Sequence, residues 1–285
     1  MIAPMRRLES LRPLARAAAG LALPVGLAEA LEAKRTFERR GLGPASLRTY
    51  RQAWLSRLHL LPVDLDLTAG VVVDVGANEG NFSNAVLALA PHAHVIAVEP
   101  SPGPRARLEA RLGARPTLTV VGSALAAESG TATLHLTAHD HNTSLHAPRE
   151  EMQTLYEDPG WSVVQDIEVP TSTLDDLVGD QDVSALKLDV QGAELEVLSG
   201  GARTLARTAA VLLEVTFVSH YVGDATFPRL DAAMREHGFE LIAISEPGRN
   251  DEGVVTWADA CYARRSARSS ADGDIPPSTP IRGSA

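Results

Sequence analysis

A glycine-rich turn with a carboxylate just before it is the stretch of this sequence best suited to bind a ligand. Gly76, Asn78 and Gly80 follow the apolar run Val71–Val75 with the spacing Gly-x-Asn-x-Gly. The first glycine permits a positive φ and lets a ligand lie against the backbone. Asp74 is hard to explain as a core residue, so we predict that it orients the amides of the turn or binds an ammonium group. The alternatives are a plain tight turn and a carboxylate bonded only to that turn.

A second carboxylate, Glu99, ends the next apolar run. In doubly wound α/β proteins an acidic residue at this place accepts hydrogen bonds from the hydroxyls of a ribose. We predict the same role for Glu99, which makes the ligand a nucleotide-like cofactor. With residues that follow neighbouring strands, the cofactor-binding candidates are Asp74, Gly76, Asn78, Gly80, Glu99, Ser101, Ser123 and Asp189.

Lys187 and Asp189 place opposite charges on a third apolar run. Residues two apart on a strand share a face, and burying either charge alone is costly, so both need partners. They are candidates for the catalytic machinery. The structural alternative is an ion pair of Lys187 with Asp189 or with Glu214.

Further polar residues are predicted to reach the same rim of the sheet. His220 follows the run that contains Glu214, and it is our candidate for the base that deprotonates a substrate hydroxyl, because histidine titrates near neutral pH. A structural histidine and a solvated loop are the plain alternatives here. The substrate-binding candidates are His141, Asn142, Ser144, Glu214 and Tyr221.

Alternating strands and helices must position these residues. Such alternation predicts a parallel sheet with crossover helices, whose strands end at one common rim. The predicted strands are Val71–Val75, His94–Val98, Thr117–Val121, Val183–Val190, Ala210–Phe217, Phe239–Ser245 and Thr256–Tyr262. An antiparallel excursion is expected to pair Thr131–Thr137 with Val163–Val169, separated by a long loop.

Three regions follow from the pattern. Residues 1–70 are predicted to be a helical extension, which we expect to pack on the domain; a substrate lid or a surface for a partner or membrane is the alternative. Residues 71–263 form the cofactor-binding domain, and 264–285 are expected to be a disordered tail. Arginines before the apolar stretch Ala17–Ala28 loosely resemble a secretory signal. Pro24 interrupts that stretch and the cofactor is an intracellular metabolite, so we expect a cytoplasmic protein.

The amino-acid composition limits the classes of partner that this chain is expected to bind. The chain has 285 residues, 45% of them hydrophobic, and a formal net charge of −10, which argues against broad binding of nucleic acid. No apolar run is long enough for stable membrane insertion. Cys261 is the only cysteine, so no intramolecular disulfide can form. The sequence carries no signal for an oligomeric state.

Together these stretches resemble the FkbM family of S-adenosylmethionine-dependent methyltransferases. The matching stretches are Val73–Gly80, Val98–Ser101, Thr173–Leu177, Lys187–Leu198 and Val211–Val215. The resemblance implies a class I methyltransferase fold, which is Rossmann-like: a seven-stranded, mostly parallel sheet with an antiparallel edge strand. It also implies that the glycine turn binds the methionine portion of the cofactor and Glu99 its ribose. Gln191 departs from the family, which often has glutamate there.

We therefore predict an O-methyltransferase that uses S-adenosylmethionine and acts on a hydroxyl of a small molecule, such as a secondary metabolite, a sugar or a glycolipid. A divalent cation is an additional cofactor that we do not favour. The alternatives are a nicotinamide-dependent oxidoreductase on a similar sheet and a non-catalytic, cofactor-binding interaction module.

Overall fold

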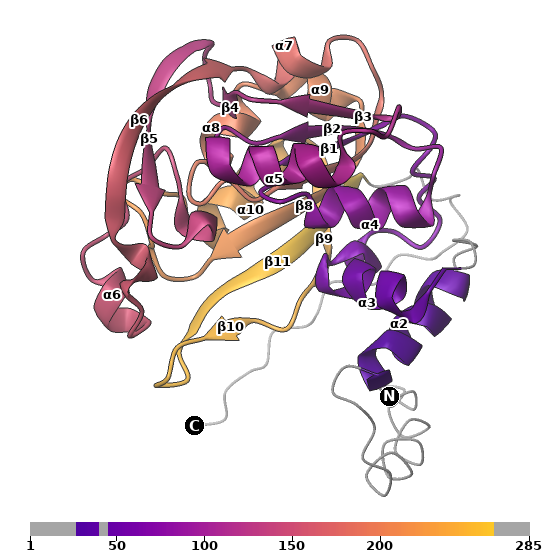
Figure 1. The fold of residues 1–285 in the computed structure, drawn as a ribbon, viewed down its shortest axis with the longest axis horizontal. Coiled ribbons are helices and arrows are strands. Elements are labelled where there is room, and N and C mark those ends of the chain that lie inside the picture. Colours follow the sequence, from indigo (N-terminus) through magenta and orange to yellow (C-terminus); the bar gives the residue numbers. More distant parts are fainter. Residues whose placement is uncertain (1–26, 40–44, 265–285) are drawn as a thin grey trace, which may run out of the picture.

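The computed structural model describes residues 27–39 and 45–264, which fold around one central sheet (Figure 1). The strand order is β10-β11-β8-β7-β1-β2-β3, and β9 pairs with β11. The strands are β1 (Val71–Val75), β2 (His94–Val98), β3 (Leu118–Val121), β7 (Val183–Leu188), β8 (Thr208–Thr216), β9 (Phe239–Ile244), β10 (Gly248–Arg249) and β11 (Val255–Arg264). Pairs β1–β2, β1–β7, β2–β3 and β7–β8 are parallel. The predicted α/β fold class is confirmed.

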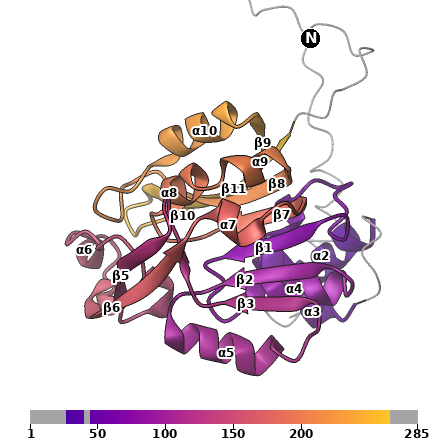
Figure 2. The same cartoon turned by 90° about the horizontal axis from the view of Figure 1, so that it is seen from above.

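Helices cover both faces of this sheet (Figure 2). One face carries α2 (Leu27–Arg39), α3 (Leu47–Leu55), η2 (Leu58–Leu60), α4 (Asn81–Leu89) and α5 (Pro102–Leu112). The other carries α7 (Leu174–Val178), α8 (Glu194–Ser199), α9 (Ala202–Ala206) and α10 (Phe227–Glu236). Because both faces are buried, β1 and β7 are apolar almost throughout instead of alternating.

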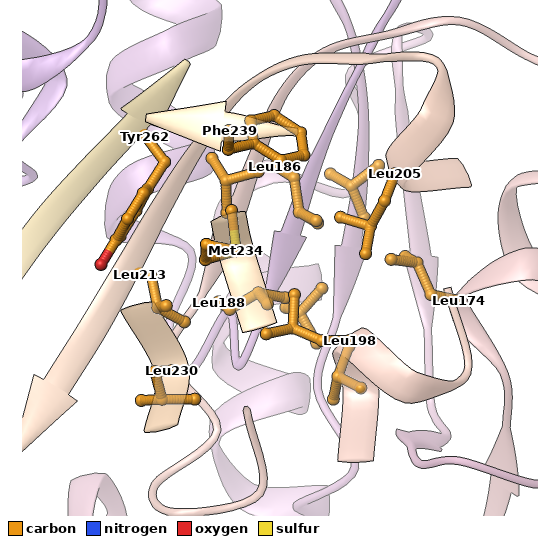
Figure 3. Close-up of a cluster of buried hydrophobic side chains, with 14 of the residues drawn as sticks. Leu174, Leu186, Leu188, Leu198, Leu205, Leu213, Leu230, Met234, Phe239 and Tyr262 are labelled. Atoms are coloured by element: carbon orange, nitrogen blue, oxygen red, sulfur yellow. The ribbon is translucent and has the colours of Figure 1, made fainter. Parts of the chain in front are cut away.

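The larger core cluster lies under α7 to α10 (Figure 3). Leucines of β7 and β8, such as Leu186 and Leu213, meet Leu230 and Met234 of α10 there. Phe239 of β9 packs in the same cluster. Burial of this apolar surface is the main force that keeps the strands and their crossover helices together.

The antiparallel strand lies inside the sheet, not at its edge as the resemblance implied. β11 runs antiparallel to β8 on one side and to β9 and β10 on the other, and the short β10 adds an eighth strand among the described residues. Ala258, Ala260 and Tyr262 of β11 are fully buried, whereas Ile242 and Ile244 of β9 are about half exposed. The apolar strand takes the covered position, and the strand with one exposed face takes the edge.

A second sheet of three strands carries the predicted excursion. Its order is β4-β6-β5, with β4 (Ala124–Leu125), β5 (Gly130–Thr137) and β6 (Val163–Ser172). β5 and β6 are antiparallel, as predicted. The connection between them contains η3 (Asp140–Asn142), α6 (Met152–Leu155) and η4 (Pro159–Trp161).

The described part of the amino-terminal extension shares the core of the other face. Phe37 of α2 and Tyr50 of α3 are fully buried, and they join one cluster with Phe82 and Val86 of α4. Arg57 Nε donates to Asp259 Oδ2 at 2.7 Å, which ties the extension to β11. The extension is therefore packed against the sheet.

Several predictions fall on residues outside the described ranges. They include most of the secretory-like stretch near the amino terminus and the tail from residue 265 onward. Within the described residues, no helix has the length and apolar character needed to cross a bilayer.

Truncation of the core should destabilise the fold. Leu186 is completely buried in the larger core cluster, so Leu186→Ala is expected to lower the free energy of unfolding by about 2–5 kcal/mol in urea titrations. Val164→Ala is the control, because Val164 is 66% exposed and its truncation should cost less than about 1 kcal/mol. Equal losses in the two variants would contradict the assignment of this core.

Candidate functional site

A cavity of about 490 Å³ opens at the carboxyl ends of the central strands. This is the end of a doubly wound sheet where ligands bind, and the volume lies in the range of small-molecule sites. Nine predicted site residues line it: Gly76, Asn78, Glu99, His141, Asn142, Ser144, Asp189, Glu214 and His220. Six do not: Asp74, Gly80, Ser101, Ser123, Lys187 and Tyr221.

The two glycines of the turn each allow a close approach to a different part of the fold. Gly76 has φ +73°, and a Cβ there would lie 1.8 Å from the carbonyl oxygen of Asp189, so only glycine lets the turn approach the end of β7. Gly80 has φ +76°, and a Cβ there would meet Leu108 and Leu112 of α5. The first glycine therefore shapes the cavity, and the second allows the turn to pack against a helix.

Glu99 is held rigidly at the cavity wall. Its Oε2 accepts from the Asn78 amide at 2.8 Å and its Oε1 from the Ser101 amide at 2.9 Å. Burial raises the pKa of Glu99, and the two amide bonds oppose that rise. Each carboxylate oxygen keeps a lone pair, so Glu99 can still accept from the two hydroxyls of a ribose. The Ser101 residue contributes its backbone amide to this arrangement.

Asp74 and Lys187 lie below the cavity, inside the sheet. Asp74 Oδ2 accepts from the backbone amide of Ser83 at 3.1 Å and from its hydroxyl at 2.6 Å, which fixes the start of α4. Lys187 Nζ lies 3.6 Å from Asp74 Oδ1 and donates to Asp189 Oδ2 at 3.1 Å. Burial disfavours its charge, but Asp189 and Asp74 outweigh burial and raise the pKa of Lys187. Lys187 therefore stays a cation and positions Asp189.

Gln191 is the centre of the polar network at the far end of the cavity. It has φ +57°, and its Nε2 donates to Asp189 Oδ1 at 2.7 Å and to Glu214 Oε1 at 3.1 Å. Its Oε1 accepts from the Tyr221 hydroxyl at 2.8 Å. Tyr221 therefore acts through Gln191, one layer behind the cavity. The sequence showed Gln191 only as a departure from the family, and its role depends on contacts across the fold.

His220 faces an aromatic wall. Its Nε2 lies 2.7 Å from the Tyr156 hydroxyl, and its ring lies edge-on to Tyr156 and Trp161. Burial lowers the pKa of His220 to about 4, so the imidazole is neutral at pH 7 and a weak base. Tyr156, Trp161 and Trp257 also line the cavity. Sequence reasoning missed these aromatic residues, because they have no motif spacing and two of them lie in the long connection.

The polar residues of that connection have distinct tasks. Ser144 Oγ donates to the carbonyl oxygen of Gln191 at 2.6 Å and accepts from the His146 amide at 2.9 Å, so it fastens the connection to the sheet. Asn142 is buried, and its Nδ2 has no hydrogen-bond partner in the described structure. A buried donor without a partner is costly, so Asn142 is suited to donate to a bound ligand. His141 lies at the exposed rim.

Metal binding has little support from the side chains present. Among the described residues, no group of three or more histidine, cysteine, aspartate or glutamate side chains is gathered so that it could hold a metal ion. The cavity carboxylates Asp189 and Glu214 both accept a hydrogen bond from Gln191 Nε2.

Comparison with known proteins agrees with this geometry. A family model described as the methyltransferase FkbM domain matches residues 74–241. The chain belongs to the FkbM methyltransferase family. The match runs from Asp74 in β1 to Leu241 in β9, and it contains the glycine turn, Glu99 and the network around Gln191. This membership decides against the nicotinamide-dependent oxidoreductase.

Individual relatives are more distant. The 2-O-methyltransferase NoeI of Sinorhizobium fredii is 26% identical over 167 residues, which are 54% of this chain and 66% of NoeI. The antimetabolite synthetase AmbE of Pseudomonas aeruginosa is 33% identical over 205 residues, 60% of this chain and 10% of AmbE. The chain thus spans just under two thirds of NoeI and a tenth of AmbE. Magnesium protoporphyrin IX methyltransferase from Synechocystis, solved with bound S-adenosylmethionine, is 13% identical with a TM-score of 0.40, over 80% of this chain and 89% of that one.

Loss of the Glu99 charge should weaken cofactor binding. Hydrogen bonds to a charged group contribute about 1.5–3 kcal/mol, so Glu99→Ala is expected to weaken binding of S-adenosylhomocysteine by roughly 10- to 200-fold in calorimetry. Glu109→Gln on the exposed face of α5 is the control and should bind as the wild type does. Wild-type affinity in Glu99→Ala would contradict the ribose assignment.

Protonation of His220 should destabilise the fold in acid. Its pKa is about 4 in the folded protein and about 6.5 when unfolded, so its stabilising contribution is complete above pH 6.5 and is lost as the pH falls towards 4. Between pH 7 and pH 4 the wild type should lose up to about 3 kcal/mol more free energy of unfolding than His220→Gln. Parallel pH profiles of the two proteins in urea titrations would refute the buried neutral imidazole.

Proposed function

We propose that this protein transfers a methyl group from S-adenosylmethionine to a hydroxyl of a small molecule. The observation that carries the proposal is one cavity with the amide-bonded carboxylate of Glu99 at one side and the Asp189–Gln191–Glu214 network at the other. The FkbM family membership supports methyl transfer, and NoeI is named as an O-methyltransferase. The acceptors we propose are secondary metabolites, sugars or glycolipids, and we place the reaction in the cytoplasm, where the methyl donor is made.

The residues present fit this cofactor. Gly76 and Asn78 would hold its methionine portion, Glu99 its ribose, and Asp189 would face its charged end. Apolar side chains of Leu125 and Leu134 on the same cavity can cover its base. When bound, S-adenosylmethionine supplies a methyl group activated by a positive sulfur.

The remaining task of the protein is to orient the acceptor and to take its proton. Asn142 Nδ2 can donate to an acceptor oxygen, and the aromatic side chains of Tyr156 and Trp161 exclude water from that end. Glu214, whose pKa is raised by burial and by neighbouring negative charges, is a better proton acceptor than His220, whose pKa is about 4. Positioning can account for about 7–11 kcal/mol of the barrier and a general base for about 10²–10⁴-fold in rate.

Transfer of a labelled methyl group tests the proposal. The wild type is incubated with methyl-labelled S-adenosylmethionine and fractions of a small-molecule extract rich in hydroxyl groups, and labelled product is expected in at least one fraction. In Glu214→Gln the rate should fall by about 10²-fold, the lower end of what a general base contributes. Glu109→Gln, on the exposed surface of α5, is the control with the wild-type rate. Failure of the wild type to bind the methyl donor would refute the function.

A further inference from the structure

Asp189 and Glu214 share one hydrogen-bond donor at the same end of the cavity. Gln191 Nε2 lies 2.7 Å from Asp189 Oδ1 and 3.1 Å from Glu214 Oε1. The Tyr221 hydroxyl donates a hydrogen bond to Gln191 Oε1. Because the amide oxygen faces Tyr221, the NH₂ group of Gln191 faces both carboxylates. Two carboxylates on one NH₂ group repel each other when both are ionised. This repulsion opposes ionisation of Glu214, while the bond from Lys187 compensates part of the negative charge on the Asp189 side.

The groups around Glu214 reinforce this preference. Burial is the largest cause of its raised pKa, and the negative charges of Asp189, Asp259 and Glu194 raise it further. Lys187 acts in the opposite direction, but its ammonium group is already engaged by two other carboxylates.

Among the described residues, no lysine or arginine lines this end of the cavity. Asp259, the neighbour of Glu214 across β8 and β11, is paired with Arg57. His220 is neutral because burial lowers its pKa to about 4, and burial raises the pKa of Tyr221 well above its ordinary value. Burial and the neighbouring negative charges thus oppose ionisation of Glu214 while the cavity holds no ligand.

The lining of the whole cavity is acidic. Its charged residues are Glu99, Asp140, Asp158, Asp189 and Glu214, and none of the described residues that line it is a lysine or an arginine. Coulomb attraction in such a site favours a ligand with positive charge over an uncharged one of the same shape.

We propose that Asp189 and Glu214 form a cation-binding site in which Glu214 releases its proton when a positively charged ligand group binds. The cavity then prefers the sulfonium methyl donor to its uncharged thioether product. This inference rests on the proposed function, because it takes the donor as the cation. The inference adds to the proposed function an electrostatic reason why the protein binds the methyl donor more tightly than the product.

The same carboxylate completes the charge balance of methyl transfer. As the acceptor oxygen forms its bond to the methyl carbon, the carbon–sulfur bond breaks and its electron pair stays on sulfur. The hydroxyl proton goes to the ionised carboxylate of Glu214. Before transfer the site holds the ion pair of the sulfonium and the ionised Glu214. After transfer it holds a neutral thioether and a protonated Glu214, which no longer attract each other by charge.

Proton release on binding tests the inference without any acceptor. Titration calorimetry is carried out at pH 7 in two buffers of different ionisation enthalpy, with S-adenosylmethionine and with S-adenosylhomocysteine. We expect the wild type to release about one proton per methyl donor and close to none per thioether. The donor should bind at least about tenfold more tightly, the lower end for an interaction with a charged group.

Matched variants identify the group that loses the proton. Glu214→Gln should abolish the release and bring the two affinities within about threefold, whereas Asp158→Asn, an acid-to-amide change at another wall of the cavity, should retain the release. Equal proton release with both ligands, or release that persists in Glu214→Gln, would overturn the inference. If Glu214→Gln does not fold, the difference in proton release between the two ligands in the wild type is sufficient to test the inference. Absence of binding by either ligand would instead refute the proposed function.

Discussion

A buried ammonium group between two carboxylates holds the ligand-binding end of this protein together. Lys187 of β7 lies opposite Asp74 of β1 in the sheet register and also bonds Asp189, which lines the cavity. Asp74 in turn fixes the start of α4 through Ser83. Two strands, a helix and a cavity carboxylate are thus joined by one chain of charges. Removal of one member of such a buried set leaves the others uncompensated, which typically costs several kcal/mol.

The acceptor end of the cavity is assembled by contacts between distant parts of the sequence. The Tyr221 hydroxyl, which donates to Gln191, also lies 3.1 Å from the carbonyl oxygen of Asn142, 79 residues away. Ser144 Oγ donates to the carbonyl oxygen of Gln191, 47 residues away. These contacts hold the connection between β5 and β6 next to the turn that follows β7. Tyr156, which follows α6, and Trp161 of η4 belong to this connection and line the cavity.

Burial and hydrogen bonds act in opposite directions on the carboxylates of the site. Glu99 accepts from two backbone amides, and burial still raises its pKa. Glu194 accepts from the amides of Val190 and Gly192, yet burial raises its pKa to about 7. Neighbouring carboxylates can therefore differ in protonation at one pH, because each is set by its own donors and its own exclusion from water.

Local patterns in the sequence determined the alternating strands, the glycine turn, the acid that ends β2 and the pairing of β5 with β6. Such features depend on residues close along the chain, or on apolar runs that must be covered on both faces. Only the tertiary structure placed β11 inside the sheet, moved Asp74 and Lys187 beneath the cavity and made Gln191 the link between Asp189 and Glu214. It also brought Trp161 and Trp257 to one cavity. These outcomes depend on which strands become neighbours and which side chains lose water together, and neither is encoded in the spacing of any one segment.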